Sequence, residues 1–153
     1  FYSPLSQEIE LMGIDSRRQT NLDGILRLPA EQQLEVLKHT SVKNIEVGHV
    51  ATTLRESLLE KVFAAAERLV ETCKKEYAPG LIGPFALQGA ISSEEGKEEL
   101  VLFDLSFRVP GSPGIAATPY TGYLYGHSVS IGRRLAQEVK QAVKQNRLHE
   151  VLT

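Results

Sequence analysis

The chain has 153 residues, of which 42% are hydrophobic and 24% are charged, so its composition is that of a globular protein and excludes a disordered one. A formal net charge of −2 gives no electrostatic argument for a nucleic-acid or membrane-surface partner, and no apolar run approaches the roughly 20 residues of a transmembrane helix. The single cysteine, Cys73, excludes a disulfide framework and is typical of a reducing compartment, so we expect a cytoplasmic protein.

The sequence opens at Phe1-Tyr2-Ser3-Pro4, without an initiator methionine and within an apolar, β-prone stretch. A natural start is usually more polar. We therefore expect residues 1–153 to be one portion of a longer polypeptide.

Short apolar runs in the first part of the chain predict two strands joined by a turn at residues 21–24. Pro29 suits the first turn of a short helix, and residues 42–50 are a candidate strand. The clearest helix is predicted over residues 53–77, with Thr53 and Glu56 as a capping box. Its apolar residues recur at spacings of three and four and form one stripe, Leu54, Leu58, Val62, Ala65, Leu69 and Cys73.

A β-hairpin is predicted from residues 81–92 and 99–110, with its turn at residues 94–96. A loop rich in proline and glycine follows, and the last helix is expected to begin near Ser128 or Ser130. Its predicted buried stripe is apolar and consists of Ile131, Leu135, Val139 and Val143. Because helices and strands are interleaved around an antiparallel hairpin, we predict an α+β fold.

Two groups of residues near the C-terminal helix leave alternatives open. Arg133 and Arg134 open this helix, where the helix dipole disfavours cations. Their position indicates an anionic partner, either an acidic side chain or a bound phosphate. The three tyrosines at 120, 123 and 125 could stack on a base, but packing with hydrogen-bonded hydroxyls is the favoured interpretation.

The hairpin carries the most informative pattern, because alternation divides its side chains between two faces. On the second strand we expect an apolar row to face a core, namely Val101, Phe103, Leu105 and Phe107. On the first strand we expect the same of Phe85, Leu87 and Ile91. Asp104, Ser106 and Arg108 then share the opposite face with Gln88, which small alanines flank.

A carboxylate with neighbouring neutral oxygens suits Mg²⁺, and Arg108 could hold a phosphate or acyl-phosphate oxygen. By pattern alone, a solvated sheet surface with a weak Asp–Arg pair is the simpler explanation. For His49, at a strand end, a polar cap is likewise the simpler explanation beside a general base or ligand.

Six sequence blocks, in this order, resemble the C-terminal half of the archaeal PurP family. The blocks are Glu10–Asp15, Leu54–Leu59, Gly83–Gln88, Leu102–Arg108, Thr118–Tyr120 and Gly132–Ala136. The resemblance implies the C-terminal lobe of an ATP-grasp fold, an antiparallel sheet with flanking helices. The N-terminal substrate and ATP-clamp regions then lie outside residues 1–153.

The same resemblance implies an ATP-dependent carbon–nitrogen ligase of purine (IMP) biosynthesis, which formylates 5-aminoimidazole-4-carboxamide ribonucleotide with formate. It implies ATP and Mg²⁺ as cofactors, with Mn²⁺ as an alternative, small-molecule substrates and a homo-oligomer. By resemblance, the metal ligands are Gln88 and Asp104, the nucleotide contacts are Gln19 and Ser106, the substrate contact is His49 and the catalytic residue is Arg108.

Four departures from the family pattern fall on this expected site. Asp104 and Gln19 each stand where the family has glutamate, and His49 stands where it has asparagine. Residues 110–114 replace an expected Gly-Thr-Asn loop. These changes support an alternative function, a catalytically altered paralogue that acts as a nucleotide-binding or regulatory subunit. A plain structural interaction domain is a third hypothesis.

Overall fold

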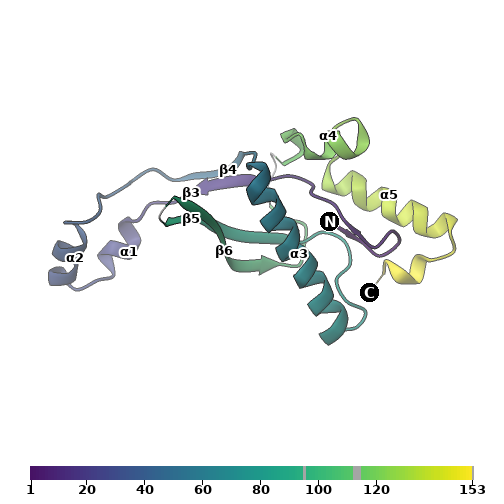
Figure 1. The fold of residues 1–153 in the computed structure, drawn as a ribbon, viewed down its shortest axis with the longest axis horizontal. Coiled ribbons are helices and arrows are strands. Elements are labelled where there is room, and N and C mark those ends of the chain that lie inside the picture. Colours follow the sequence, from purple (N-terminus) through teal and green to yellow (C-terminus); the bar gives the residue numbers. More distant parts are fainter. Residues whose placement is uncertain (95, 112–114, 153) are drawn as a thin grey trace.

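The computed structural model describes residues 1–94, 96–111 and 115–152, which form three two-stranded antiparallel sheets and five α-helices (Figure 1). The sheets pair β1 (Tyr2–Ser3) with β2 (Glu8–Ile9), β3 (Asp15–Arg18) with β4 (Val47–Ala51), and β5 (Ala86–Glu94) with β6 (Lys97–Ser106). The helices are α1 (Leu22–Leu26), α2 (Ala30–Val36), α3 (Glu56–Glu76), α4 (Tyr120–Tyr125) and α5 (Ile131–Lys144). Short 3₁₀ turns lie at Ile115–Ala117 and Leu148–Glu150. The predicted α+β fold is confirmed. None of the helices in the described residues is both long and apolar enough to cross a membrane.

The first part of the chain differs from the prediction in two places. Residues 21–24 do not form a turn between strands, because helix α1 begins at Leu22 and buries Ile25. The helix after Pro29 is confirmed as α2. The predicted strand at 42–50 is shorter and later, because only Val47–Ala51 pairs with β3.

Helix α3 follows the predicted stripe, with Leu58 and Ala65 buried along it, but its predicted capping box is wrong. The helix begins at Glu56, and Arg55 is its N-cap residue. No side chain caps this N-terminus by a hydrogen bond. The Tyr120 hydroxyl accepts a hydrogen bond from the Leu54 N–H at 2.9 Å. The Leu54 N–H is therefore satisfied by a residue outside the helix.

The β5–β6 hairpin has a bulge that the alternation rule did not anticipate. Gln88 lies opposite Asp104, but the next residue, Gly89, lies opposite Leu102, so Phe103 is an extra residue on β6. Gln88 and Gly89 are neighbours on β5 and point to opposite faces. Their partners Asp104 and Leu102 therefore also point to opposite faces.

The bulge corrects the predicted core face of β6. Beside α3, Leu100 and Leu102 line a hollow together with Ala65 and Arg68. The four residues predicted to face a core are instead exposed, including Phe103 at 64%. On β5, Phe85 and Leu87 are partly buried as predicted, whereas Ile91 is exposed. The extra residue moves Val101 to the open face with Asp104, whereas Leu105, opposite Leu87, stays on the face of Leu102.

The predicted stripe of α5 is confirmed for Ile131 and Leu135, which pack in the core, but it is wrong for Val139 and Val143. Ser130 caps this helix by accepting a hydrogen bond from the Arg133 N–H, and Ile131 is buried. Val139 and Val143 are exposed, and the positions that are buried next to Ile131 are Arg134, Glu138 and Ala142. The helix is thus rotated so that a charged pair faces the interior.

The buried charges belong to a set of hydrogen-bonded residues, which we call the Arg134 network: Ser3, Glu10, Tyr125, Arg134 and Glu138. Arg134 donates two hydrogen bonds to Glu10, at 2.6 and 2.8 Å, and one to Glu138 at 2.7 Å. The Tyr125 hydroxyl donates to Glu10, and the Ser3 hydroxyl donates to Glu138, both at 2.6 Å. The network joins the first sheet to α4 and α5, and it gives Arg134 the acidic partner predicted as one alternative.

Electrostatics within the Arg134 network follow from this geometry. Burial acts to raise the pKa of Glu10, but the hydrogen bonds from Arg134 and Tyr125 outweigh it and lower this pKa below 4.5. Burial, together with the hydrogen bond to Glu10, raises the pKa of Tyr125 to about 12. The hydroxyl of Tyr125 therefore stays a donor, as the favoured interpretation of the tyrosines predicts.

Substituting Gly89 tests the bulge. A Cβ at Gly89 would lie 2.7 Å from the Val101 carbonyl oxygen, closer than such contacts occur. We expect Gly89→Ala to lower the free energy of unfolding by about 1–3 kcal/mol. Gly132→Ala is the matched control, because its Cβ meets nothing within 4 Å. Urea denaturation of both variants checks this, and equal stabilities would contradict the close approach.

Removing Arg134 tests the buried network. Arg134→Met leaves the buried carboxylate of Glu138 and the partly buried one of Glu10 without their cation, so we expect a loss of about 3–5 kcal/mol of unfolding free energy. The exposed neighbour provides the control, since Arg133→Met should change stability by less than about 0.5 kcal/mol.

The pH dependence of the same variants gives a second readout. In the unchanged protein the lowered pKa of Glu10 contributes stability above pH 4.5, and this is lost as the pH falls through the folded-state pKa. Without Arg134, the pKa of Glu10 loses the largest of the interactions that lower it, so the stability lost on acidification should be smaller in Arg134→Met than in the unchanged protein. A variant that loses stability on acidification as the unchanged protein does would contradict the assigned cause.

Candidate functional site

The open face of the hairpin brings together three of the predicted site residues. Gln88 lies directly opposite Asp104, and Ser106 lies opposite Ala86, in the same antiparallel ladder. Directly opposed residues share a face, and this face points away from Leu102 and α3. Gln88 and Asp104 are exposed and Ser106 is partly buried. An amide, a carboxylate and a hydroxyl therefore lie side by side above small alanines.

Arg108 lies just beyond the end of β6. It is exposed, and its Nη1 donates a hydrogen bond to the Val109 carbonyl oxygen at 3.2 Å. No ion pair between Arg108 and Asp104 is found among the described residues, so the simple Asp–Arg surface pair is not formed. The guanidinium is exposed, and within the described residues it bonds to the backbone of the adjacent residue.

Gln19 and His49 belong to another sheet. His49 lies within β4, and Gln19 is the exposed residue that follows β3. The β3–β4 ladder changes register between Ser16 and Arg18, and His49 has a positive φ of 53°. Such a backbone is uncommon for a residue other than glycine. The structure thus separates Gln19 and His49, by sheet, from the other predicted site residues.

His49 is not a simple polar cap. Its Nδ1 contacts the Asp15 carboxylate across the ladder, and both side chains are partly buried. Sequence reasoning missed Asp15 as a site residue. The available signal was its place at the end of the block Glu10–Asp15, a carboxylate directly after an apolar stretch.

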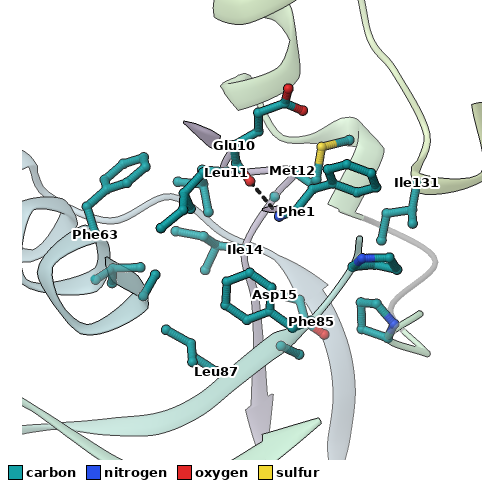
Figure 2. A pocket seen from close by; sticks show the side chains of 17 residues that line it. Phe1, Glu10, Leu11, Met12, Ile14, Asp15, Phe63, Phe85, Leu87 and Ile131 are labelled. Carbon is teal, nitrogen blue, oxygen red and sulfur yellow. Dashed lines mark hydrogen bonds between the residues drawn. The ribbon is translucent and has the colours of Figure 1, made fainter. Parts of the chain in front are cut away.

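A cavity of about 170 Å³ connects the two sheets, since residues of both line it. Asp15 and Ile14 lead into β3 on one side, and Ala86 and Leu87 of β5 lie on another. Figure 2 shows Ile14, Asp15 and Leu87 around this space, with Phe63 of α3 facing it as well. The lining is mainly apolar. Pro110 also lines the cavity, whereas residues 112–114 of the substituted loop lie outside the described residues.

The donor set of the open face consists of oxygen atoms, which are the ligands that Mg²⁺ takes. The described residues contain no group of three or more His, Cys, Asp or Glu side chains that could hold a metal. Mg²⁺ needs fewer protein ligands, because it keeps water and phosphate oxygens and binds through one or two carboxylates. Asp104 and Gln88 fit that limited role.

Comparison with known proteins shows which family the chain belongs to. All of residues 1–153 match the family described as "Domain of unknown function (DUF1297)". The chain belongs to this family.

The curated relatives are named 5-formaminoimidazole-4-carboxamide-1-(beta)-D-ribofuranosyl 5'-monophosphate synthetase. The protein from Methanosphaera stadtmanae is 39% identical over 155 residues, which is 100% of this chain and 41% of the relative. The protein from Thermococcus kodakarensis is 41% identical, again over 100% of this chain and 45% of the relative. The chain thus spans less than half the length of these relatives.

A solved structure shows the same fold. The crystal structure of the IMP biosynthesis protein PurP from Thermococcus kodakaraensis superposes with a TM-score of 0.69 and 32% sequence identity. The match covers 100% of this chain and 47% of that protein. The resemblance to the PurP family, drawn from sequence blocks, is confirmed.

Proposed function

We propose that this chain is the C-terminal portion of an ATP- and Mg²⁺-dependent ligase. The reaction is the formylation of 5-aminoimidazole-4-carboxamide ribonucleotide with formate, a step of purine biosynthesis in the cytoplasm. The names of the relatives support this product, because each is a synthetase of the formamido ribonucleotide. The observation that carries the proposal is the direct pairing of Gln88 and Asp104 on an open sheet face.

Each residue of the open face has a role in this proposal. Asp104 and Gln88 hold the metal, and Ser106 contacts the nucleotide beside them. A bound Mg²⁺ would supply positive charge to the transferring phosphoryl group. Arg108, at the edge of the face, stabilises the negative charge on the acyl phosphate, because a guanidinium binds such oxygens with two parallel hydrogen bonds.

Residues of the β3–β4 sheet complete the proposed site. His49, positioned by Asp15, contacts the ribonucleotide substrate, and Gln19 contacts ATP. The remaining parts of both sites come from regions outside residues 1–153, since relatives are more than twice as long. In this proposal the 153 residues do not catalyse without those regions.

Substitutions at Asp104 test the proposal in the full-length protein. The measurement is calorimetric titration with Mg²⁺ and a non-hydrolysable ATP analogue. We expect Asp104→Asn to weaken metal-dependent binding at least about tenfold, or about 1.4 kcal/mol, because the amide removes the anionic ligand. Asp104→Glu restores the longer side chain of the family pattern and should bind at least as tightly as the unchanged protein.

Asp23→Asn is the control for the loss of one negative charge, because Asp23 is exposed on α1 at a distance along the fold. If Asp104→Asn leaves the binding affinity unchanged, or if Asp23→Asn weakens it equally, the hairpin does not bind the metal and has only a structural role.

A second candidate function is a catalytically altered paralogue that binds nucleotide and regulates a partner. The observation that favours it is the contact between His49 and Asp15. It engages the imidazole of His49 with a carboxylate of this chain, at a position where the family pattern has asparagine. We expect this protein to release ADP slowly or not at all with formate and ribonucleotide, and His49→Asn with Asp104→Glu to raise the rate. A coupled assay of ADP release checks this, and full substrate-dependent release by the unchanged protein would exclude the altered paralogue.

A further inference from the structure

His49 combines its contact to a carboxylate with an unusual backbone conformation. Its φ of 53° lies in the left-handed region, which glycine adopts readily and other residues seldom adopt. The neighbouring residue, Gly48, has no positive φ. The strained conformation therefore falls on the residue that carries the imidazole, and strain of this kind collects at functional sites.

A bulge in β4 explains where the imidazole points. The ladder pairs Ser16 with Val50 but pairs Arg18 with Val47. One residue of β3 therefore lies opposite two residues of β4, and His49 is the second of these two. A bulge changes the direction of a side chain at a sheet edge. Here the side chain that it redirects is the imidazole.

Thr52 fixes both chain neighbours of Asp15. Its N–H donates to the Ile14 carbonyl oxygen at 3.0 Å, and its hydroxyl donates to the Ser16 hydroxyl, also at 3.0 Å. Asp15 itself pairs with Ala51 at the end of the ladder. The Asp15 side chain, which is 22% exposed, is therefore held in the lining of the cavity (Figure 2).

The contact between His49 and Asp15 defines what the imidazole can do. A carboxylate accepts hydrogen bonds, so Nδ1 of His49 carries the ring proton and Nε2 carries the lone pair. The negative charge of Asp15 also stabilises the imidazolium that forms when Nε2 takes up a proton. The His49 side chain is 37% exposed, so a ligand can reach the ring.

Few of the six predicted site residues can accept a proton. Four of them are amides, a hydroxyl or a guanidinium, which are not bases at neutral pH, namely Gln19, Gln88, Ser106 and Arg108. Asp104 is an anion, but in the proposed function it holds the metal. Of these six residues, His49 is the one whose lone pair is left for a proton.

The proposed formyl transfer releases one proton. The amine nitrogen of the ribonucleotide attacks the carbonyl carbon of formyl phosphate, and a C–N bond forms. The C–O bond to the phosphoryl group breaks, and inorganic phosphate leaves with the electron pair. The nitrogen must also lose a proton to become a neutral amide. A positioned base that accepts such a proton speeds the step by roughly 10²–10⁴-fold.

We propose that His49 is a catalytic residue of this transfer, which accepts the amine proton at Nε2, and that Asp15 is its positioning residue. This role rests on the proposed ligase function and concerns only its second half-reaction. Asparagine, which stands here in the family pattern, can contact the substrate through its amide but cannot take up the proton. The base is therefore a feature of this chain and not of that pattern.

The first test separates the two half-reactions in the full-length protein. Positional isotope exchange in ATP with formate alone reports formation of formyl phosphate, and appearance of the formamido ribonucleotide reports transfer. We expect His49→Asn to keep the exchange and to lower kcat for transfer at least about tenfold, with KM for the ribonucleotide changed less than about twofold. Asparagine tolerates a positive φ, so the bulge is retained.

His39→Asn is the matched control. His39 also contacts a carboxylate, that of Glu35 at 3.5 Å, but it lies in the exposed turn after α2. We expect this variant to match the unchanged protein in both exchange and transfer.

The unchanged protein separates failure of this role from failure of the ligase function. If it shows neither exchange nor transfer, the ligase function and the role of His49 both fail. If it shows both and His49→Asn has an equal or higher kcat, only the role of His49 is overturned. Exchange without transfer in the unchanged protein, or loss of exchange in His49→Asn, also overturns the assignment of His49 to the transfer step.

The second test examines the chemistry of the two side chains. His49→Gly removes the ring, and glycine adopts the positive φ without strain. Added imidazole should raise the transfer rate of this variant and leave that of the unchanged protein unaltered. We expect Asp15→Asn to lower kcat at least about tenfold, and the double variant with His49→Asn to be no slower than His49→Asn alone. Absence of rescue would overturn the proton transfer, and additive losses would overturn the positioning by Asp15.

Discussion

The ion pair of Arg134 with Glu10 and Glu138 is the interaction on which the arrangement of this fold depends. It joins the segment that follows β2 to the last helix, more than one hundred residues later in the chain. A guanidinium in the interior is tolerated only when its donors are satisfied, and here Glu10 accepts two of its hydrogen bonds. The need to satisfy Arg134 sets the rotation of α5 and leaves Val139 and Val143 at the surface. The first sheet is thereby held beside α4 and α5.

The bulge at Gly89 is the second constraint, and it connects the fold to the candidate site. Without the extra residue Phe103, Asp104 would face the same side as Leu102, against α3. With this extra residue, Asp104 lies on the open face, directly opposite Gln88. Gly89 permits this because a side chain there would meet the Val101 carbonyl. The bulge thus places the Asp104 carboxylate on the exposed face of the hairpin.

The candidate site is divided between two sheets. The proposed metal ligands lie on the hairpin, and the cavity beside Asp15 links the hairpin to the β3–β4 sheet. His49 and Asp15 belong to that second sheet, where they contact each other across the ladder. Residues that are far apart in the chain, Asp15 and Ala86, therefore line one space.

Sequence alone determined the fold class, the long helix α3 and the hairpin. These features are local, because they follow from periodicity and from residues that lie close together along the chain. The capping of α3, the buried face of α5 and the core face of β6 were decided by tertiary structure. In each case a contact with another segment overrode the local pattern. The Leu54 N–H donates to Tyr120, and Glu10 accepts from Arg134. Strand β6 has one residue more than the part of β5 that it pairs with. Free energy of burial depends on what lies opposite a side chain, and a sequence pattern does not contain that information.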